Sequence, residues 1–170
     1  VEACLAELAD TSDPRPLFLA CGIFKPHSPF FAPAAYHEDS SFHPLLSTHD
    51  WGDLPWGAWE LMRNKQWFWN GMMKLNERIP GSYANFLDAY AACCRYADAS
   101  IGRVLDGLEK SGRRENTIIV LWSDHGFHVG EKNHIEKFAL WEKSNRIPFL
   151  IVAPGVTEPG TVCDRPVDLM

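Results

Sequence analysis

The chain has 170 residues, a hydrophobic fraction of 46% and a formal net charge of −6 at pH 7. This length suits one domain with a real apolar core. The negative charge argues against nucleic acid or an anionic membrane surface as a partner, and no run approaches the roughly 20 apolar residues of a membrane span. Both ends look cut, with neither an initial Met nor a signal-peptide layout, so we expect a fragment of a longer protein.

The cysteines form no recognisable framework. Their number is odd and their spacing fits neither a zinc site nor a set of disulfides. We therefore expect buried free thiols at Cys4, Cys21, Cys93, Cys94 and Cys163.

The first half of the chain contains a predicted helix, a strand and a long loop region. Residues 1–8 have helical spacing, and the apolar run at residues 17–21 is typical of a strand. A stiff loop with two prolines follows at residues 25–29. Residues 31–80 are predicted to form an irregular insertion, and such long segments are often functional. Its tryptophans favour packing, with a sugar-binding platform as the alternative, at Trp51, Trp56, Trp59, Trp67 and Trp69.

The second half alternates helix and strand signals. Apolar residues recur at a period near 3.6 over residues 82–110, which predicts one long helix, with Gly112 as its stop. The apolar runs at residues 117–122 and 149–152 predict buried strands. This order predicts an α/β fold whose mostly parallel sheet is flanked by helices.

Asp124 and His125 come directly after the predicted strand at residues 117–122, and Gly126 lets the chain turn there. Ligand sites in open α/β sheets gather at the carboxyl ends of strands. A carboxylate beside an imidazole makes a plausible metal corner, and a histidine ligand suits zinc or a transition metal better than calcium. The alternative is a loop turn with a surface histidine. Two residues cannot close a site, so further ligands must come from elsewhere.

Three other polar residues are candidates for the same site. His27 follows the first predicted strand, and it can bind an anionic oxygen or protonate a leaving group if the two strands are neighbours. Lys137 can meet an anionic substrate, because the apolar residues after it can anchor the backbone and aim the lysine. Lys25 lies beside His27. The alternatives are a satisfied loop histidine and solvated lysines, and His128 and His134 are predicted to have no functional role.

The chain resembles the sulfatase family of the alkaline phosphatase superfamily, and most closely its iduronate-2-sulfatase-like branch. The resemblance is carried by residues 18–30, 90–108 and 123–132, and it continues through Lys137 to residues 146–148, 153–155 and 164–167. It implies an alkaline-phosphatase-like fold, present here as an incomplete, central-to-late part (residues 1–170) of one catalytic domain. The missing N- and C-terminal parts of the same protein would complete it.

The resemblance also implies an activity. Sulfatases hydrolyse sulfate esters with a formylglycine nucleophile and a divalent metal, usually calcium. By position, Asp124 and His125 look like metal ligands, while His27 and Lys137 look like catalytic, sulfate-binding residues. Lys25 looks like a further substrate contact. No cysteine or serine in residues 1–170 has the family's nucleophile motif (Cys or Ser, any residue, Pro or Ala, any residue, Arg). The nucleophile is therefore expected upstream, and the chain alone is expected to be inactive.

The expected substrate is a sulfated sugar or a small organic sulfate. Two other functions stay open, namely a phosphonate or phosphate ester hydrolase of the same superfamily and a non-catalytic binding domain that keeps the fold. Family analogy alone points to a periplasmic, secreted or lysosomal location.

Overall fold

The computed structural model describes residues 1–37, 54–63 and 66–169. The chain divides into two compact units, and each is described in turn. The first comprises Val1–Phe42 and Phe86–Thr117, and the second His43–Asn85 and Ile118–Met170.

The first unit is built on the long helix α4, Ser82–Lys110, which begins in the second unit. The predicted helix over residues 82–110 is confirmed. Gly112 follows it with φ +70°, the left-handed conformation in which helices commonly end. The buried side chains follow the 3.6-residue period and are mostly small, so other segments can approach the helix closely; they are Leu87, Ala91, Ala92, Cys93, Ala97, Ser100 and Leu108.

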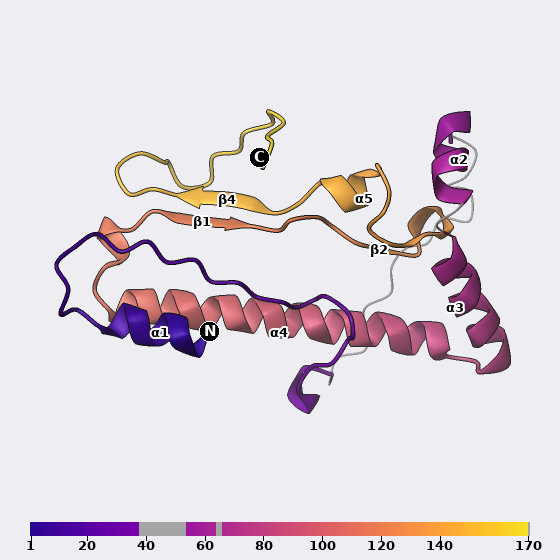
Figure 1. Ribbon diagram of the computed structural model, residues 1–170, viewed down its shortest axis with the longest axis horizontal. Coiled ribbons are helices and arrows are strands. Elements are labelled where there is room, and N and C mark those ends of the chain that lie inside the picture. The colour runs from indigo at the N-terminus through magenta and orange to yellow at the C-terminus, as the bar shows by residue number, and fades with distance from the viewer. Residues whose placement is uncertain (38–53, 64–65, 170) are drawn as a thin grey trace. The chain divides into compact units, whose positions relative to one another are not determined.

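Helix α1, Glu2–Ala9, lies along the C-terminal half of α4, as Figure 1 shows. Its predicted helical spacing is thus confirmed. Glu2 Oε1 accepts a hydrogen bond from Arg103 at 2.5 Å. Leu5 packs so closely on Gly107 that a Cβ on this glycine would lie 2.4 Å from the leucine Cδ2. Two short 3₁₀ turns, Ala34–Tyr36 and Arg114–Asn116, complete the first unit.

The strand expected at residues 17–21 does not form. The segment has no ladder partner among the described residues, and the Phe18 side chain is 93% exposed. An apolar run becomes a strand only when another strand takes up its backbone hydrogen bonds. The sequence pattern indicated an apolar run, but it could not indicate whether a neighbouring strand would be available to pair with it.

The second unit contains the remaining helices and all four strands of the described residues. Its helices are α2, Trp56–Arg63, α3, Trp67–Arg78, and the short α5, Glu142–Asn145. Its strands are β1, Ile119–Trp122, β2, His128–Val129, β3, Ile135–Glu136, and β4, Phe149–Val152. A 3₁₀ turn, Glu131–Asn133, connects β2 to β3.

The strands form two antiparallel pairs. β1 pairs with β4, with Ile119 opposite Val152 and Trp122 opposite Phe149, and Figure 1 shows the two strands side by side. β2 pairs with β3 in the same sense. The strands predicted at residues 117–122 and 149–152 are present. The described residues contain no parallel pair, because the chain between β1 and β4 brings β4 back along β1 in the opposite direction.

The β1–β4 pair is less buried than its composition predicts. All four residues of β4 are exposed, and β1 alternates between half-buried and exposed positions. The burial predicted for apolar strands requires layers on both faces, and the described residues do not supply both.

Residues 31–80 are not irregular throughout. They contain α2 and α3, so the expectation of an irregular insertion is wrong for residues 56–63 and 67–78. Trp56 and Trp67 are 79% and 63% exposed, whereas the Trp69 ring meets the Tyr83 ring edge-on, with centroids 5.8 Å apart. Trp51 lies outside the described residues, and the side chain of Trp59 is likewise not described.

The cysteines are free, as expected, but only some are buried. Cys4 and Cys93 are buried, Cys21 and Cys94 are half-buried, and Cys163 is exposed. Burial raises the pKa of the Cys93 and Cys94 thiols, which keeps them protonated and unreactive at neutral pH. Among the described helices, none is both long and apolar enough to span a bilayer.

Candidate functional site

The predicted metal corner is a tight turn at the end of β1. The Ser123 hydroxyl donates to the carbonyl of His125 at 2.7 Å, and the His125 N–H donates to Asp124 Oδ1 at 3.1 Å. The Asp124 side chain is 83% exposed and that of His125 is 32% exposed. The turn thus presents a carboxylate to solvent beside a partly buried imidazole.

The His125 ring is held in one tautomer. Its Nδ1 lies 2.7 Å from the Gly126 carbonyl oxygen, and a carbonyl can only accept, so Nδ1 carries the hydrogen. In the neutral ring Nε2 then holds the lone pair. Metal-binding histidines are commonly oriented by a hydrogen bond of this kind on the second ring nitrogen.

The two atoms that could bind a metal, one from each side chain, lie close together. His125 Nε2 lies 3.4 Å from Asp124 Oδ2. Two ligand atoms that each lie about 2.4 Å from one ion, at a right angle, are about 3.4 Å apart. A lone pair facing a carboxylate is unfavourable unless a proton or a cation lies between them, so the pair can form an ion pair when the imidazole is protonated and can share a divalent cation when it is neutral.

The pair supplies only part of a coordination shell. Among residues 1–37, 54–63 and 66–169, no group of three or more His, Cys, Asp and Glu side chains gathers as a metal site would require. Calcium takes about six to eight ligands, and a tetrahedral zinc site takes four. Asp124 and His125 therefore fit as one corner of a larger site.

Lys137 follows the β2–β3 hairpin in the same unit. Its side chain is half-buried, and its Nζ lies 6.0 Å from the centroid of the Phe138 ring. Glu136, the residue before it, has φ +101°, a conformation that costs a non-glycine residue roughly 1–3 kcal/mol. The surrounding hairpin must therefore hold the backbone that leads into Lys137.

The support for this hairpin is buried and largely polar. His128, His134 and Ile135 are each 0% exposed, and the two histidine rings meet edge-on with centroids 5.2 Å apart. The Tyr83 hydroxyl donates to the Val129 carbonyl at 2.5 Å. The hairpin is therefore tied to the beginning of α4 as well as closed on itself.

Burial shifts the pKa of two groups around this hairpin. It lowers the pKa of His134 to about 4, with the neighbouring His128 as a second cause. It raises the pKa of Tyr83 to about 12, helped by the negative charge of Glu131. Both groups are therefore neutral at pH 7. From the sequence we predicted no functional role for His128 and His134. No local pattern of residues indicates that the two histidines form a buried pair.

Lys25 and His27 lie in the first unit, in the loop after residues 17–21. Lys25 Nζ donates to the carbonyls of Pro29 and His27 at 2.5 and 3.3 Å. His27 is exposed, and its Nδ1 lies 2.6 Å from the Ser28 carbonyl oxygen. Lys25 therefore closes its own loop, and Nε2 is the ring nitrogen of His27 that remains available to a ligand.

The structure brings together some of the predicted residues. Asp124 and His125 share one turn, and Lys137 belongs to the same unit. Lys25 and His27 share one loop of the other unit. The approach of His27 to Asp124 remains a prediction.

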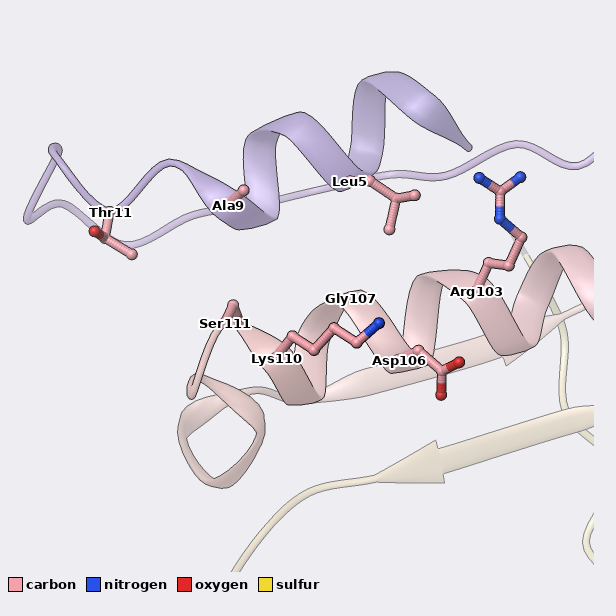
Figure 2. A pocket seen from close by; sticks show the side chains of 8 residues that line it. All are labelled: Leu5, Ala9, Thr11, Arg103, Asp106, Gly107, Lys110 and Ser111. Carbon is pink, nitrogen blue, oxygen red and sulfur yellow. The ribbon is translucent and has the colours of Figure 1, made fainter.

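A pocket lies elsewhere, within the first unit. It is a hollow of about 540 Å³ between α1 and the end of α4, shown in Figure 2. It carries two cationic side chains, Arg103 and Lys110, together with the carboxylate of Asp106. None of the predicted site residues lines it.

Comparison with known proteins identifies the family. A family model described as Sulfatase matches residues 2–169. The chain belongs to the sulfatase family. This family is part of the alkaline phosphatase superfamily, whose fold is α/β.

Individual sulfatases support the assignment. A protein named Sulfatase from Formosa agariphila is 33% identical over 165 residues, covering 92% of this chain and 31% of the relative. Iduronate 2-sulfatase of Mus musculus is 29% identical and covers 85% of the chain and 28% of the relative. An arylsulfatase of Clostridium perfringens is 32% identical, with 83% and 28% covered. The chain thus spans less than a third of the length of these sulfatases.

Proposed function

We propose that the full-length protein to which this chain belongs hydrolyses sulfate esters, with a sulfated sugar or a small organic sulfate as substrate. The observation that carries the proposal is the Asp124–His125 corner. Its two donor atoms lie 3.4 Å apart, and the Nδ1 hydrogen bond leaves Nε2 free for a ligand. In a member of the sulfatase family, this corner is best explained as part of a metal site.

Asp124 and His125 would hold the cation through Oδ2 and Nε2. A bound divalent cation supplies Lewis-acid stabilisation of negative charge on the sulfate oxygens. We propose calcium, which the family resemblance favours, although the imidazole is a nitrogen ligand and calcium prefers oxygen. The rest of the shell must then be rich in oxygen.

Lys137 would neutralise the sulfate group. A sulfate ester carries one negative charge, and charge grows on the leaving oxygen as the S–O bond breaks. A lysine ammonium in a partly buried position stabilises such charge more strongly than the same ammonium in water. The strained Glu136 backbone beside it is consistent with a side chain that must be aimed.

His27 would act at the leaving oxygen. Its Nδ1 is tied to the Ser28 carbonyl, so a protonated ring presents Nε2–H outward. That hydrogen can be donated to the departing oxygen. Lys25 would support this role by holding the carbonyl of His27 in place.

The nucleophile belongs to another part of the protein in this proposal. Residues 1–170 contain no cysteine or serine in the sulfatase nucleophile motif. We therefore propose that the formylglycine lies outside this chain, and that residues 1–170 bind part of the substrate and metal but do not turn over alone.

The test is turnover by the full-length protein on an aryl sulfate, an aryl phosphate and a phosphonate monoester, each with and without calcium. We expect sulfate release to dominate and to require the metal. Preference for either phosphorus ester would instead make the protein a phosphate or phosphonate hydrolase. Absence of both turnover and calcium binding would favour a binding domain that has lost catalysis.

A further inference from the structure

Gly126 packs directly against the backbone of α5. Its N–H donates to the carbonyl of Ser144 at 2.7 Å. A Cβ built on Gly126 would lie 2.0 Å from the carbonyl oxygen of Lys143 and 2.9 Å from its carbonyl carbon. No side chain fits in that space unless the turn or α5 moves.

Helix α5 is held by hydrogen bonds within its own backbone. The Trp141 carbonyl accepts from the N–H groups of Ser144 and Asn145 at 2.9 and 3.2 Å, and the Arg146 N–H donates to Glu142 O at 2.7 Å. Arg146 and Glu142 also form an ion pair at 2.8 Å. Ser144 is only 2% exposed. The helix is therefore a short, closed unit against which Gly126 rests.

The segments on both sides of α5 are also connected to the site. On the C-terminal side, the Pro148 carbonyl accepts from the N–H of Ser123 at 3.3 Å, and Ser123 directly precedes Asp124. On the N-terminal side, Lys132 Nζ lies 5.5 Å from the centroid of the Trp141 ring. Lys137 itself lies between Lys132 and Trp141 in the sequence. The segments that flank α5 therefore contact both the corner and the stretch of chain that carries Lys137.

The contact between Gly126 and α5 is linked to the metal corner through the carbonyl of Gly126. The Gly126 carbonyl is the acceptor that orients the His125 ring. A shift of Gly126 moves this carbonyl and therefore moves Nε2 relative to Asp124 Oδ2. Ligand geometry must hold within about 0.5 Å for a metal site to keep its affinity.

We propose that α5 is a positioning element for the metal corner and that Gly126 is its contact point, so that the packing of Gly126 on residues 143–144 sets the separation of the two ligand atoms. This inference rests on the proposed metal site. It adds a residue and a helix that do not themselves touch the cation.

The test is calcium titration of the full-length protein after chelator treatment, by calorimetry and by calcium-dependent thermal stabilisation. Gly126→Ala is expected to weaken calcium binding by about 10- to 100-fold, the usual cost of disturbing groups behind a metal ligand. Excess calcium is expected to restore most of its sulfatase activity. A merely structural role would lower the melting temperature of the metal-free protein and leave the calcium affinity unchanged.

Matched substitutions separate positioning from general damage. Gly71→Ala on α3 places a Cβ where no atom lies within 4 Å, so its calcium affinity is expected to equal that of the wild type. Ser144→Ala removes a buried hydroxyl that has no hydrogen-bond partner among the described residues, and it is also expected to bind calcium normally. Ser144→Val enlarges the same buried position and is expected to weaken calcium binding as Gly126→Ala does. If Gly126→Ala does not fold, the calcium affinity of Ser144→Val tests the positioning role of α5 instead.

The outcomes distinguish failure of the proposed metal site from failure of the proposed role of α5. If the wild type binds no calcium, or if Asp124→Asn leaves binding intact, the metal site itself is wrong and the role of α5 is overturned with it. If the wild type binds calcium through Asp124 while Gly126→Ala or Ser144→Val binds equally well, only the role of α5 is overturned.

Discussion

The chain carries two histidine loops that are alike in one respect and opposite in another. In the loop after residues 17–21, Nδ1 of His27 contacts the carbonyl of Ser28 at 2.6 Å, and in the corner after β1, Nδ1 of His125 contacts the carbonyl of Gly126 at 2.7 Å. Each carbonyl belongs to the next residue, so both rings expose Nε2. The same local hydrogen bond therefore orients both imidazoles so that Nε2 can bind a ligand.

The charged neighbours of the two rings differ in sign. His125 has the Asp124 carboxylate 3.4 Å from Nε2, whereas His27 has the Lys25 ammonium bonded to its own carbonyl. A carboxylate beside a lone pair attracts a cation, and an ammonium beside an imidazole favours an anion. This difference supports the proposed division into a metal corner and a sulfate-binding loop.

Substitution of the carboxylate in the corner is expected to have the largest effect. Asp124→Asn should remove calcium binding and lower kcat/KM for an aryl sulfate by about 1,000-fold or more, because loss of a metal removes several kcal/mol of transition-state stabilisation. Steady-state kinetics across a calcium series measures this. The exposed Asp98→Asn on α4 is the control, and equal losses in both variants would refute a specific role for Asp124.

Removal of the cation at Lys137 is expected to come next. Lys137→Met should reduce kcat/KM by about 100- to 1,000-fold, the range for losing one charge-stabilising group. The melting temperature should hardly change, because single charges outside the core contribute little to stability. Lys74→Met, on an exposed position of α3, should behave as the wild type. Normal turnover by the Lys137 variant would show that this lysine does not meet the sulfate.

The anion-side histidine should show an effect that depends on the leaving group. His27→Asn is expected to lower kcat by about 100-fold on an alkyl sulfate, a typical loss for general acid catalysis. The loss should be clearly smaller on a nitrophenyl sulfate, whose leaving oxygen needs no proton. His37→Asn, at an exposed position of the same unit, serves as the control. Equal losses on both esters would assign His27 to binding instead.

The last expected effect concerns stability rather than turnover, and it involves the buried His134, which the proposed mechanism does not use. Burial, and then the neighbouring His128, lower the pKa of His134 from 6.5 to about 4. Because the unfolded state binds the proton more tightly, stability should be complete above pH 6.5 and fall as the pH drops from 6.5 towards 4. The expected loss in the free energy of unfolding is on the order of 3 kcal/mol, because the pKa of His134 differs by about 2.5 between the folded and unfolded states.

Urea unfolding of the wild type and His134→Leu at pH 7 and 4.5 measures this contribution. The variant should lose less stability over that interval than the wild type does. His37→Asn should keep the wild-type pH dependence. An identical pH dependence in the wild type and His134→Leu would show that His134 does not resist protonation.

Local sequence determined the elements whose signal repeats along the chain. The 3.6-residue period defined α4, and short apolar runs located β1 and β4. It also located the corner, since Asp124 and His125 are neighbours in the sequence and need no distant contact to share a turn. Lys137 was selected from the apolar residues that follow it and then given its role through a family resemblance, and the family itself is confirmed by the match over residues 2–169.

The tertiary structure decided what depends on partners far apart in the sequence. Residues 17–21 and residues 119–122 are similarly apolar, yet among the described residues only the latter have a strand to pair with, in β4. His134 is buried in the β2–β3 hairpin, whose Val129 carbonyl accepts a hydrogen bond from the distant Tyr83. Gly126 meets Lys143 and Ser144 only after the chain has returned past Lys137. Hydrogen bonding and close packing between such segments depend on distance in space, which no local pattern of residues encodes.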